Sequence, residues 1–228
     1  MTDSIKTKAI VLRRTNYGEA DRILSILTPV GKMSVMAKGV RKERSKLAGG
    51  IELLSLSDVT VHEGRGDLGV LTSARLVDFY GEIMKDLEAM EFVGGVLKEV
   101  SRRAEQVDVP EYFDLTRQLL AGVDGVLKAG ERTKLAVIAV WWRLNVVRAG
   151  GEEVNLRVDA RGARLVEDKR YSWDGQTQAM VPDEQGEIGG EHIKLMRLMM
   201  SSPLKLALRV QDVEGLVSGV GDILRSLC

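Results

Sequence analysis

The sequence reads GKMSVMAKG at residues 31–39, just before its most basic stretch. Met33, Val35 and Ala37 fall on every second position, which is the period of a half-buried β-strand. Gly31 and Gly39 bound this run, and glycine is common in the turns that end strands. The segment therefore predicts a short strand in a β-rich part of the chain.

Further β-rich runs bounded by turn residues lie on both sides of this segment. They cover residues 5–14, 22–28, 51–62 and 70–77. Five strands of this length fit a small barrel, and the five-stranded Greek-key barrel that commonly binds oligonucleotides is the OB-fold. We therefore predict an N-terminal five-stranded OB-fold barrel in residues 1–80.

The hydrophobic period changes after residue 80. Apolar residues recur at helical spacing from Ala89 to Val100, from Tyr112 to Val126 and again from about residue 132 to 148. Residues 152–190 are polar and rich in turns. The predicted fold class is mixed β and α. We expect a barrel in 1–80, a helical domain in 81–151 and 191–228, and a small finger-like insert in 152–190.

The composition excludes several classes of protein. Apolar residues make up 44% and charged residues 29% of the chain, which favours neither disorder nor a membrane protein. The first thirty residues carry no apolar core of signal-peptide length, so we expect a cytoplasmic protein. The single cysteine is Cys228 and the two histidines are His62 and His192, too few for a disulfide framework or a cysteine and histidine zinc site. We expect no cofactor.

The net charge of zero hides an asymmetry. Residues 1–80 hold 13 basic and 9 acidic residues, whereas the rest of the chain holds 20 and 24. Within 32–46 the lone acid is Glu43, and phosphate is the natural partner of such a stretch. We predict a phosphate contact formed by Lys38, Arg41, Lys42, Arg44 and Lys46, with a secondary set of Arg13, Arg14 and Arg22. The alternative is a basic loop that is only solvated.

Two other patterns favour plainer interpretations. Residues 64–69 satisfy the letters G-x-G-x-x-G, but a dinucleotide site needs a helix after the glycines, and a β-rich run follows here. We expect a hairpin loop, and a nucleotide-dependent enzyme remains an alternative. Trp141 and Trp142 lie among apolar residues at helical spacing, which favours core packing over base stacking. No catalytic motif is present, and we expect no enzyme.

Several segments of the amino-terminal region resemble RecO proteins in order and spacing. They are Ala9–Leu12, Tyr17–Ile23, Thr28 with Gly31 and Lys32, Ala37–Lys42, Ser45–Leu47 and Gly66–Leu68. The likeness is dense over about the first 80 residues and looser beyond. It implies an OB-fold, a helical domain and a non-catalytic role in recombinational repair. It further implies binding of single- and double-stranded DNA, annealing of complementary strands, and a cytoplasmic, nucleoid-associated location.

The same resemblance implies protein partners. RecO proteins act with RecR, contact the acidic C-terminal tail of single-stranded-DNA-binding protein (SSB), and help to load RecA. An acidic tail with a free carboxylate needs a cation beside an apolar groove. Arg132 and Lys134, next to Leu135 and Ile138, offer both at the start of the third predicted helix. We predict the tail site there; a pure protein adaptor that does not touch DNA is the alternative to the whole functional prediction.

The sequence departs from many RecO proteins in one respect. Those proteins carry four zinc-binding cysteines in the segment that corresponds to residues 152–190, and this sequence has none there. Residues 158–162 stand roughly where the first cysteine pair would be. We expect the insert to be held by packing, with Tyr171, Trp173 and Met180 as candidates.

Overall fold

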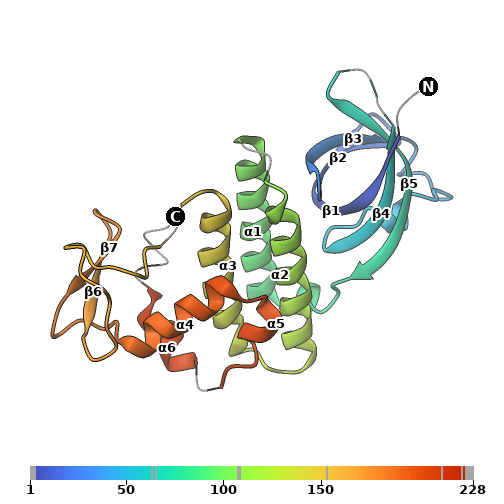
Figure 1. Cartoon of the computed structure of the whole chain (residues 1–228). Helices are drawn as coiled ribbons and strands as arrows, with labels where there is room; N and C mark the ends of the chain where they lie inside the picture. The colour runs from blue at the N-terminus through green and yellow to red at the C-terminus, as the bar shows by residue number, and fades with distance from the viewer. Residues whose placement is uncertain are drawn as a thin grey trace. The chain divides into compact units, whose positions relative to one another are not determined.

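Five strands at the amino end of the chain form one sheet that closes into a barrel, in the order β1-β2-β3-β5-β4 (Figure 1). They are β1 (Ser4–Tyr17), β2 (Asp21–Thr28), β3 (Gly31–Ala37), β4 (Ser55–His62) and β5 (Leu68–Phe79). Neighbouring strands are antiparallel except β3 and β5, whose short parallel pairing joins Ser34–Met36 to Leu68–Val70. The predicted mixed β and α class with an N-terminal five-stranded sheet is confirmed, and this region is OB-fold-like.

The computed structural model describes residues 4–62, 64, 66–106, 109–152, 154–211, 213–221 and 223. They fall into two compact units, Met1–Asp124 and Gly125–Cys228. The first unit contains the barrel, α1 (Leu87–Gln106) and most of α2 (Glu111–Lys128). The boundary expected at residue 80 therefore marks the end of the barrel, whereas the compact unit extends further.

Alternate residues of the barrel strands point to opposite faces. Inward residues such as Val11, Leu24 and Val35 form the core, and each is at most 3% exposed. On the outer face Ile10 and Leu27 are paired across β1 and β2, and both are buried as well. Helix α1 lies against β1 and β3 and covers this outer face.

The connection from β3 to β4 must cross β5, because β5 lies between these two strands in the sheet. The crossing contains a short 3₁₀ helix, η1 (Ala48–Gly50), which contacts β4 and β5. A Cβ atom at Gly50 would lie 2.5 Å from the carbonyl oxygen of Ala74 on β5, so only glycine permits this close approach. The crossing is therefore packed onto the barrel at this point.

The hairpin interpretation of residues 64–69 agrees with the strands around them. β4 ends at His62 and β5 begins at Leu68, and the two strands pair in antiparallel fashion. Glu63 and Arg65 lie outside the described residues. Because a strand and not a helix follows the glycines, the amino end of a helix that a dinucleotide site requires is absent at this loop.

The second unit is built around α3 (Lys134–Ala149), which contacts α4 (Gly190–Ser201), α5 (Leu204–Ala207) and α6 (Glu214–Gly219). Trp141 and Trp142 are 1% and 2% exposed, so their predicted packing role is confirmed. The side-chain amide of Asn145 donates to the carbonyl oxygens of Trp141 and Met199, at 2.8 and 3.0 Å. The bond to Met199 ties α3 to α4.

Residues 152–190 contain a two-stranded antiparallel sheet of β6 (Tyr171–Asp174) and β7 (Ala179–Pro182). Of the three candidates for packing, Tyr171 and Met180 are fully buried, whereas Trp173 is partly exposed. The backbone N–H of Val166 donates to the Tyr171 hydroxyl at 3.0 Å. Packing of Tyr171 and Met180 therefore organises this segment.

A carboxylate holds the turn where the resemblance would place a cysteine pair. Asp159 is 8% exposed, and its Oδ1 accepts hydrogen bonds from the backbone N–H groups of Arg161 and Ala163, both at 2.9 Å. In the part of the chain that the structure describes, no three His, Cys, Asp or Glu side chains gather as a metal site would require. The described residues of this segment do not fit a zinc ion.

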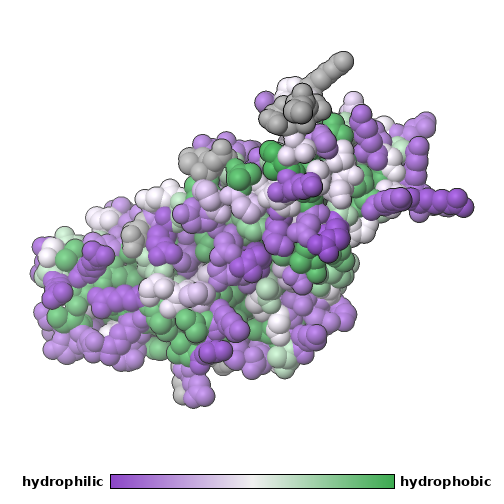
Figure 2. Space-filling model, turned by 45° about the vertical axis from the view of Figure 1, so that its right-hand side comes forward, coloured by the Kyte–Doolittle hydropathy of each residue, from purple (hydrophilic) through white to green (hydrophobic). Residues whose placement is uncertain are grey.

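Hydrophilic residues predominate on the face drawn in Figure 2, with hydrophobic residues in smaller areas between them. No helix among the described residues is long and apolar enough to cross a membrane.

The Asp159 turn predicts a local loss of stability on substitution. Asp159→Ala removes the acceptor of two hydrogen bonds, and we expect the free energy of unfolding to fall by about 1–2 kcal/mol. Amide hydrogen exchange should accelerate at Arg161 and Ala163. The exposed Asp168→Ala is the matched control. Equal effects of the two substitutions would show that the turn does not depend on this carboxylate.

Candidate nucleic-acid interface

The basic residues predicted to bind phosphate lie in the connection between β3 and β4. We call residues 38–46 the basic loop. It is anchored to the barrel by Val40, which is 3% exposed in the barrel core, and the crossing that follows it is anchored by Ile51, which is 1% exposed. Between these two anchors, residues 41–44 and Lys46 are exposed.

Hydrogen bonds fix the start of the basic loop against the turn between β1 and β2. The backbone N–H of Gly39 donates to Asp21 Oδ1 at 2.6 Å, and the backbone N–H of Arg41 donates to the Ala20 carbonyl at 2.9 Å. The Arg41 guanidinium donates to the Gly18 carbonyl at 3.3 Å. Gly39 has a φ of +64°, a left-handed conformation that favours glycine. The loop is therefore held in place before any ligand binds.

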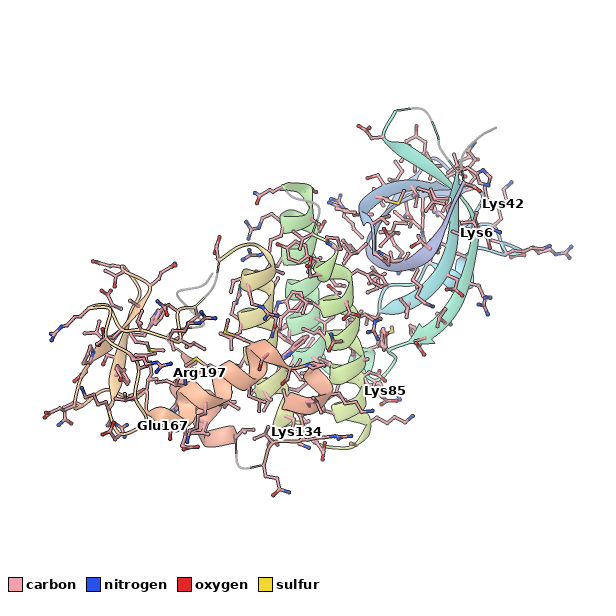
Figure 3. The ribbon with its side chains drawn as sticks, in the orientation of Figure 1. Lys6, Lys42, Lys85, Lys134, Glu167 and Arg197 are labelled. Atoms are coloured by element: carbon pink, nitrogen blue, oxygen red, sulfur yellow. The ribbon has the colours of Figure 1, made fainter. Side chains whose placement is uncertain are left out.

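All the cations of the predicted primary site are exposed. They are Lys38, Arg41, Lys42, Arg44 and Lys46, and Lys42 is labelled in Figure 3. None of them forms an ion pair within the described residues. The structure thus carries the predicted primary set on one loop, where none of its cations is paired with an acid among the described residues.

Cations on the outer face of the barrel are in a different situation. Asp58 on β4 lies between Lys8 on β1 and Arg75 on β5 and forms ion pairs with both. The hydrogen bond from Lys8, followed by that from Arg75, lowers the pKa of the Asp58 carboxyl below its ordinary value. The charge of these two cations is therefore partly neutralised by a neighbouring acid.

The predicted secondary set does not form one surface. Arg14 is ion-paired with Glu52, and Arg22 Nε donates to the Asn16 side chain at 3.2 Å. Strand register places Arg14 on the inward side with Leu24, whereas Arg13 is paired with Ser25 on the outward side. Arg22 and Arg14 lie at the end of the barrel that carries the basic loop, but only Arg13 is exposed and without a side-chain partner among the described residues.

Sequence reasoning did not single out Tyr17 as a site residue. This tyrosine ends β1, is 54% exposed, and immediately precedes Gly18, whose carbonyl accepts from Arg41. An exposed aromatic ring beside cations is the arrangement that stacks an unpaired base. Of the other aromatics in residues 1–80, Tyr80 is buried and Phe79 lies at the end of β5. The position of Tyr17 just before the turn signal at Gly18 was the available clue.

Comparison with known proteins gives the family. The family described as "Recombination protein O N terminal" matches residues 1–80. A DNA repair protein RecO from Roseiflexus sp. (strain RS-1) is 31% identical over 210 residues, which cover 89% of this chain and 72% of that protein. This chain belongs to the RecO family. The RecO match over residues 1–80 spans the whole barrel and its basic loop.

Other RecO relatives are matched over a smaller part of their length. The DNA repair protein RecO of Dehalococcoides mccartyi (strain CBDB1) is 34% identical over 155 residues, 67% of this chain and 58% of that protein. The RecO protein of Anaeromyxobacter dehalogenans (strain 2CP-C) is 33% identical over 163 residues, 70% and 61% respectively. The aligned regions thus span about three fifths of the length of these two relatives.

The residues predicted to receive the SSB tail are only partly at the surface. Arg132 is exposed and precedes α3, and Lys134 is its first residue (Figure 3). Leu135 is half-buried, but Ile138 is 0% exposed, so it cannot line an open groove. The prediction for Ile138 is wrong because α3 is surrounded by other elements on this side.

Lys134 instead lines a pocket of about 740 Å³ with residues that the sequence did not point to. The others are Leu208, Arg209, Val210, Gln211, Val213 and Gly215. Lys134 also pairs with Glu131 at 2.9 Å. Two cations beside Leu208 and Val210 reproduce the predicted combination of positive charge and apolar surface.

Proposed function

We propose that this RecO chain binds single- and double-stranded DNA through the basic loop and anneals complementary strands during recombinational repair. The observation that supports this proposal is the set of exposed cations on a loop fixed to the β1–β2 turn, with no acid paired to them among the described residues. The role is non-enzymatic: binding and neutralisation of charge need no catalytic group.

Contacts of this kind suit annealing. Phosphates are the same in every sequence, so cations that touch them do not select bases. They also lower the repulsion between two strands, and their contribution weakens as salt rises because counterions are no longer released as favourably. A strand held in this way can shift until its bases pair. Tyr17 would add one stacking contact to an unpaired base.

We propose further that the chain acts with RecR and assists RecA loading on SSB-coated single strands, in a cytoplasmic, nucleoid-associated setting. Membership of the RecO family supports the proposal of these partners. The SSB tail would bind the pocket lined by Lys134 and Arg209, with its carboxylates on the cations and its apolar residue against Leu208 and Val210. A pure protein adaptor is the competing function, and DNA binding separates the two.

Removal of charge from the basic loop should weaken DNA binding. Changing Arg41, Lys42 and Arg44 together to Ala removes three exposed cations, and we expect weaker binding of a single-stranded oligonucleotide at low salt. The plot of log affinity against log salt should become shallower by roughly 2, because each phosphate that is no longer neutralised on a single strand accounts for about 0.7 of the slope. Fluorescence anisotropy at several salt concentrations measures both.

The matched control changes Lys98, Lys128 and Lys205 together to Ala. These lysines are exposed on helices and lie far from this loop in the sequence. The control lowers the net charge equally and should change the slope much less. Equal slopes for the two variants would show that the basic loop contributes to DNA binding only through the overall charge of the protein. An unmodified protein that binds no oligonucleotide at low salt would favour the adaptor.

A substitution at Tyr17 separates stacking from charge. Tyr17→Ala keeps every cation, so the salt slope should stay the same. We expect single-strand affinity to fall by about 1–3 kcal/mol and duplex affinity to change little, because the bases of a duplex are already stacked. Tyr17→Phe keeps the ring and should bind as the unmodified protein does. Parallel loss on both DNA forms would refute the stacking role.

Charge reversal in the pocket beside α3 tests the SSB-tail site. Lys134→Glu combined with Arg209→Glu reverses both cations of the pocket and should abolish binding of a labelled SSB-tail peptide in fluorescence anisotropy. Affinity for DNA should stay nearly the same. The control reverses Lys128 and Lys205, which do not line this pocket. Unchanged peptide binding in the first variant would place the tail elsewhere.

A further inference from the structure

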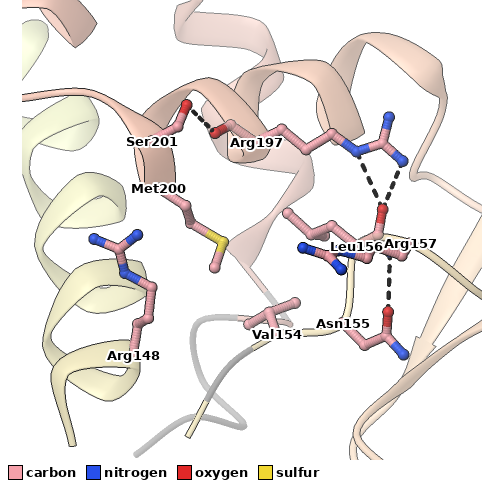
Figure 4. A pocket seen from close by; sticks show the side chains of 8 residues that line it. All are labelled: Arg148, Val154, Asn155, Leu156, Arg157, Arg197, Met200 and Ser201. Atoms are coloured by element: carbon pink, nitrogen blue, oxygen red, sulfur yellow. Dashed lines mark hydrogen bonds between the residues drawn. The ribbon is translucent and has the colours of Figure 1, made fainter. Parts of the chain in front are cut away.

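A second pocket lies within the carboxyl-terminal unit, between the end of α3, the segment that follows it, and α4. Its volume is about 550 Å³. The pocket is drawn in Figure 4, where Arg148 stands on one side, Arg197 on the other, and the side chain of Met200 between them. Neither the predicted DNA contacts nor the predicted tail site includes any residue of this pocket.

The accessible groups of the pocket are mainly hydrogen-bond donors. Arg148, Arg157 and Arg197 line it, and all three are exposed. The apolar lining residues are Val154, Leu156 and Met200, which are 3%, 6% and 7% exposed and so form a floor with little open area. No acidic residue is among the described residues that line the pocket.

Asn155 adds to this donor character. Its side-chain oxygen Oδ1 accepts from the backbone N–H groups of Arg157 and Val158, at 2.9 and 3.2 Å. The amide NH₂ group of Asn155 is a donor on the same exposed side chain. An anion that enters the pocket therefore meets guanidinium and amide N–H groups, and no carboxylate competes with it among the described lining residues.

Two of the arginines are held in position. Arg197 donates from Nε and Nη2 to the Leu156 carbonyl, at 3.1 and 2.6 Å, and so braces the segment that carries Arg157 (Figure 4). Arg148 donates from Nη2 to the Asn145 side chain at 2.9 Å. A guanidinium has five N–H donors, so each keeps several for a ligand. The Arg157 side chain has no partner within the described residues.

We infer that this pocket binds phosphate groups of a nucleic-acid strand, as a phosphate-binding site separate from the basic loop. Guanidinium groups match the paired oxygens of a phosphate, and two of these are pre-positioned. Arg157 also begins a short loop that carries the exposed Arg161 and Arg164, so a strand could meet further cations beyond the pocket. The pocket is less suited to an apolar peptide end, because its apolar residues are buried and offer little contact area.

This inference rests on the proposed function, and the experiment separates the two. The double variant Arg148→Ala and Arg157→Ala is tested in the full chain with fluorescein-labelled oligothymidine. Arg197 is kept, because it braces the segment through Leu156. We expect weaker binding and a salt slope shallower by roughly 1.4, since each phosphate that is no longer neutralised accounts for about 0.7. The control Lys169→Ala and Lys205→Ala removes the same charge from exposed positions outside the pocket.

Substitution by lysine separates charge from shape. Arg148→Lys with Arg157→Lys keeps the charge but loses the paired donors, so the slope should stay near that of the unmodified protein while affinity falls several-fold. If the alanine pair does not fold, Arg157→Ala alone serves, because that side chain has no partner to lose among the described residues. It should lower the slope by roughly 0.7.

The outcomes are distinct. Oligothymidine binding by the unmodified protein with an unchanged slope in the alanine variants overturns the inference and leaves the proposed function intact. Loss of SSB-tail peptide binding with unchanged DNA binding makes the pocket a peptide site and overturns it too. A chain that binds no oligothymidine at low salt fails the proposed function, and this inference with it.

Discussion

The short parallel pairing of β3 with β5 is the constraint on which the amino-terminal unit depends. It closes the barrel and removes the free edges that an open sheet would expose. It also places β5 between β3 and β4, so the chain must cross β5 on its way from one to the other. The basic loop exists because of this crossing, and its anchors Val40 and Ile51 are the points where the crossing returns to the core.

Cations in this protein differ in whether an acid neutralises them. Lys8 and Lys32 lie on strands and Lys194 lies on α4, and each is paired with an acid. The cations of the basic loop and Arg157 lie in connections and have no such acid among the described residues. A chain of zero net charge can therefore present concentrated positive charge where several cations lie close together in the sequence and form no ion pair.

The barrel strands could be predicted from the sequence. Apolar residues alternate along residues 31–39 and in neighbouring segments, as they do in a strand with one buried face. The sequence could not show the pairing of Arg14 with Glu52, since 38 positions separate these residues and register decides the contact. The tail site illustrates a different limit. Helix α3 buries residues on nearly every side, including Val137, Ile138 and Val140, so no apolar stripe distinguishes its inner face from a groove.

Sequence patterns could not predict the two pockets or the exposure of Tyr17 either. Arg197 follows Arg157 by 40 positions, and it joins Arg148 and Arg157 in lining one pocket because its guanidinium is bonded to the Leu156 carbonyl on the folded chain. In the insert, by contrast, the absence of the four cysteines was evident from the sequence. The structure shows that the Asp159 carboxylate holds the turn at the place of the first cysteine pair. This turn is made from a carboxylate and backbone groups. Thiol oxidation and zinc starvation would dismantle a four-thiolate module, whereas the hydrogen bonds of this turn involve neither a thiol nor a metal.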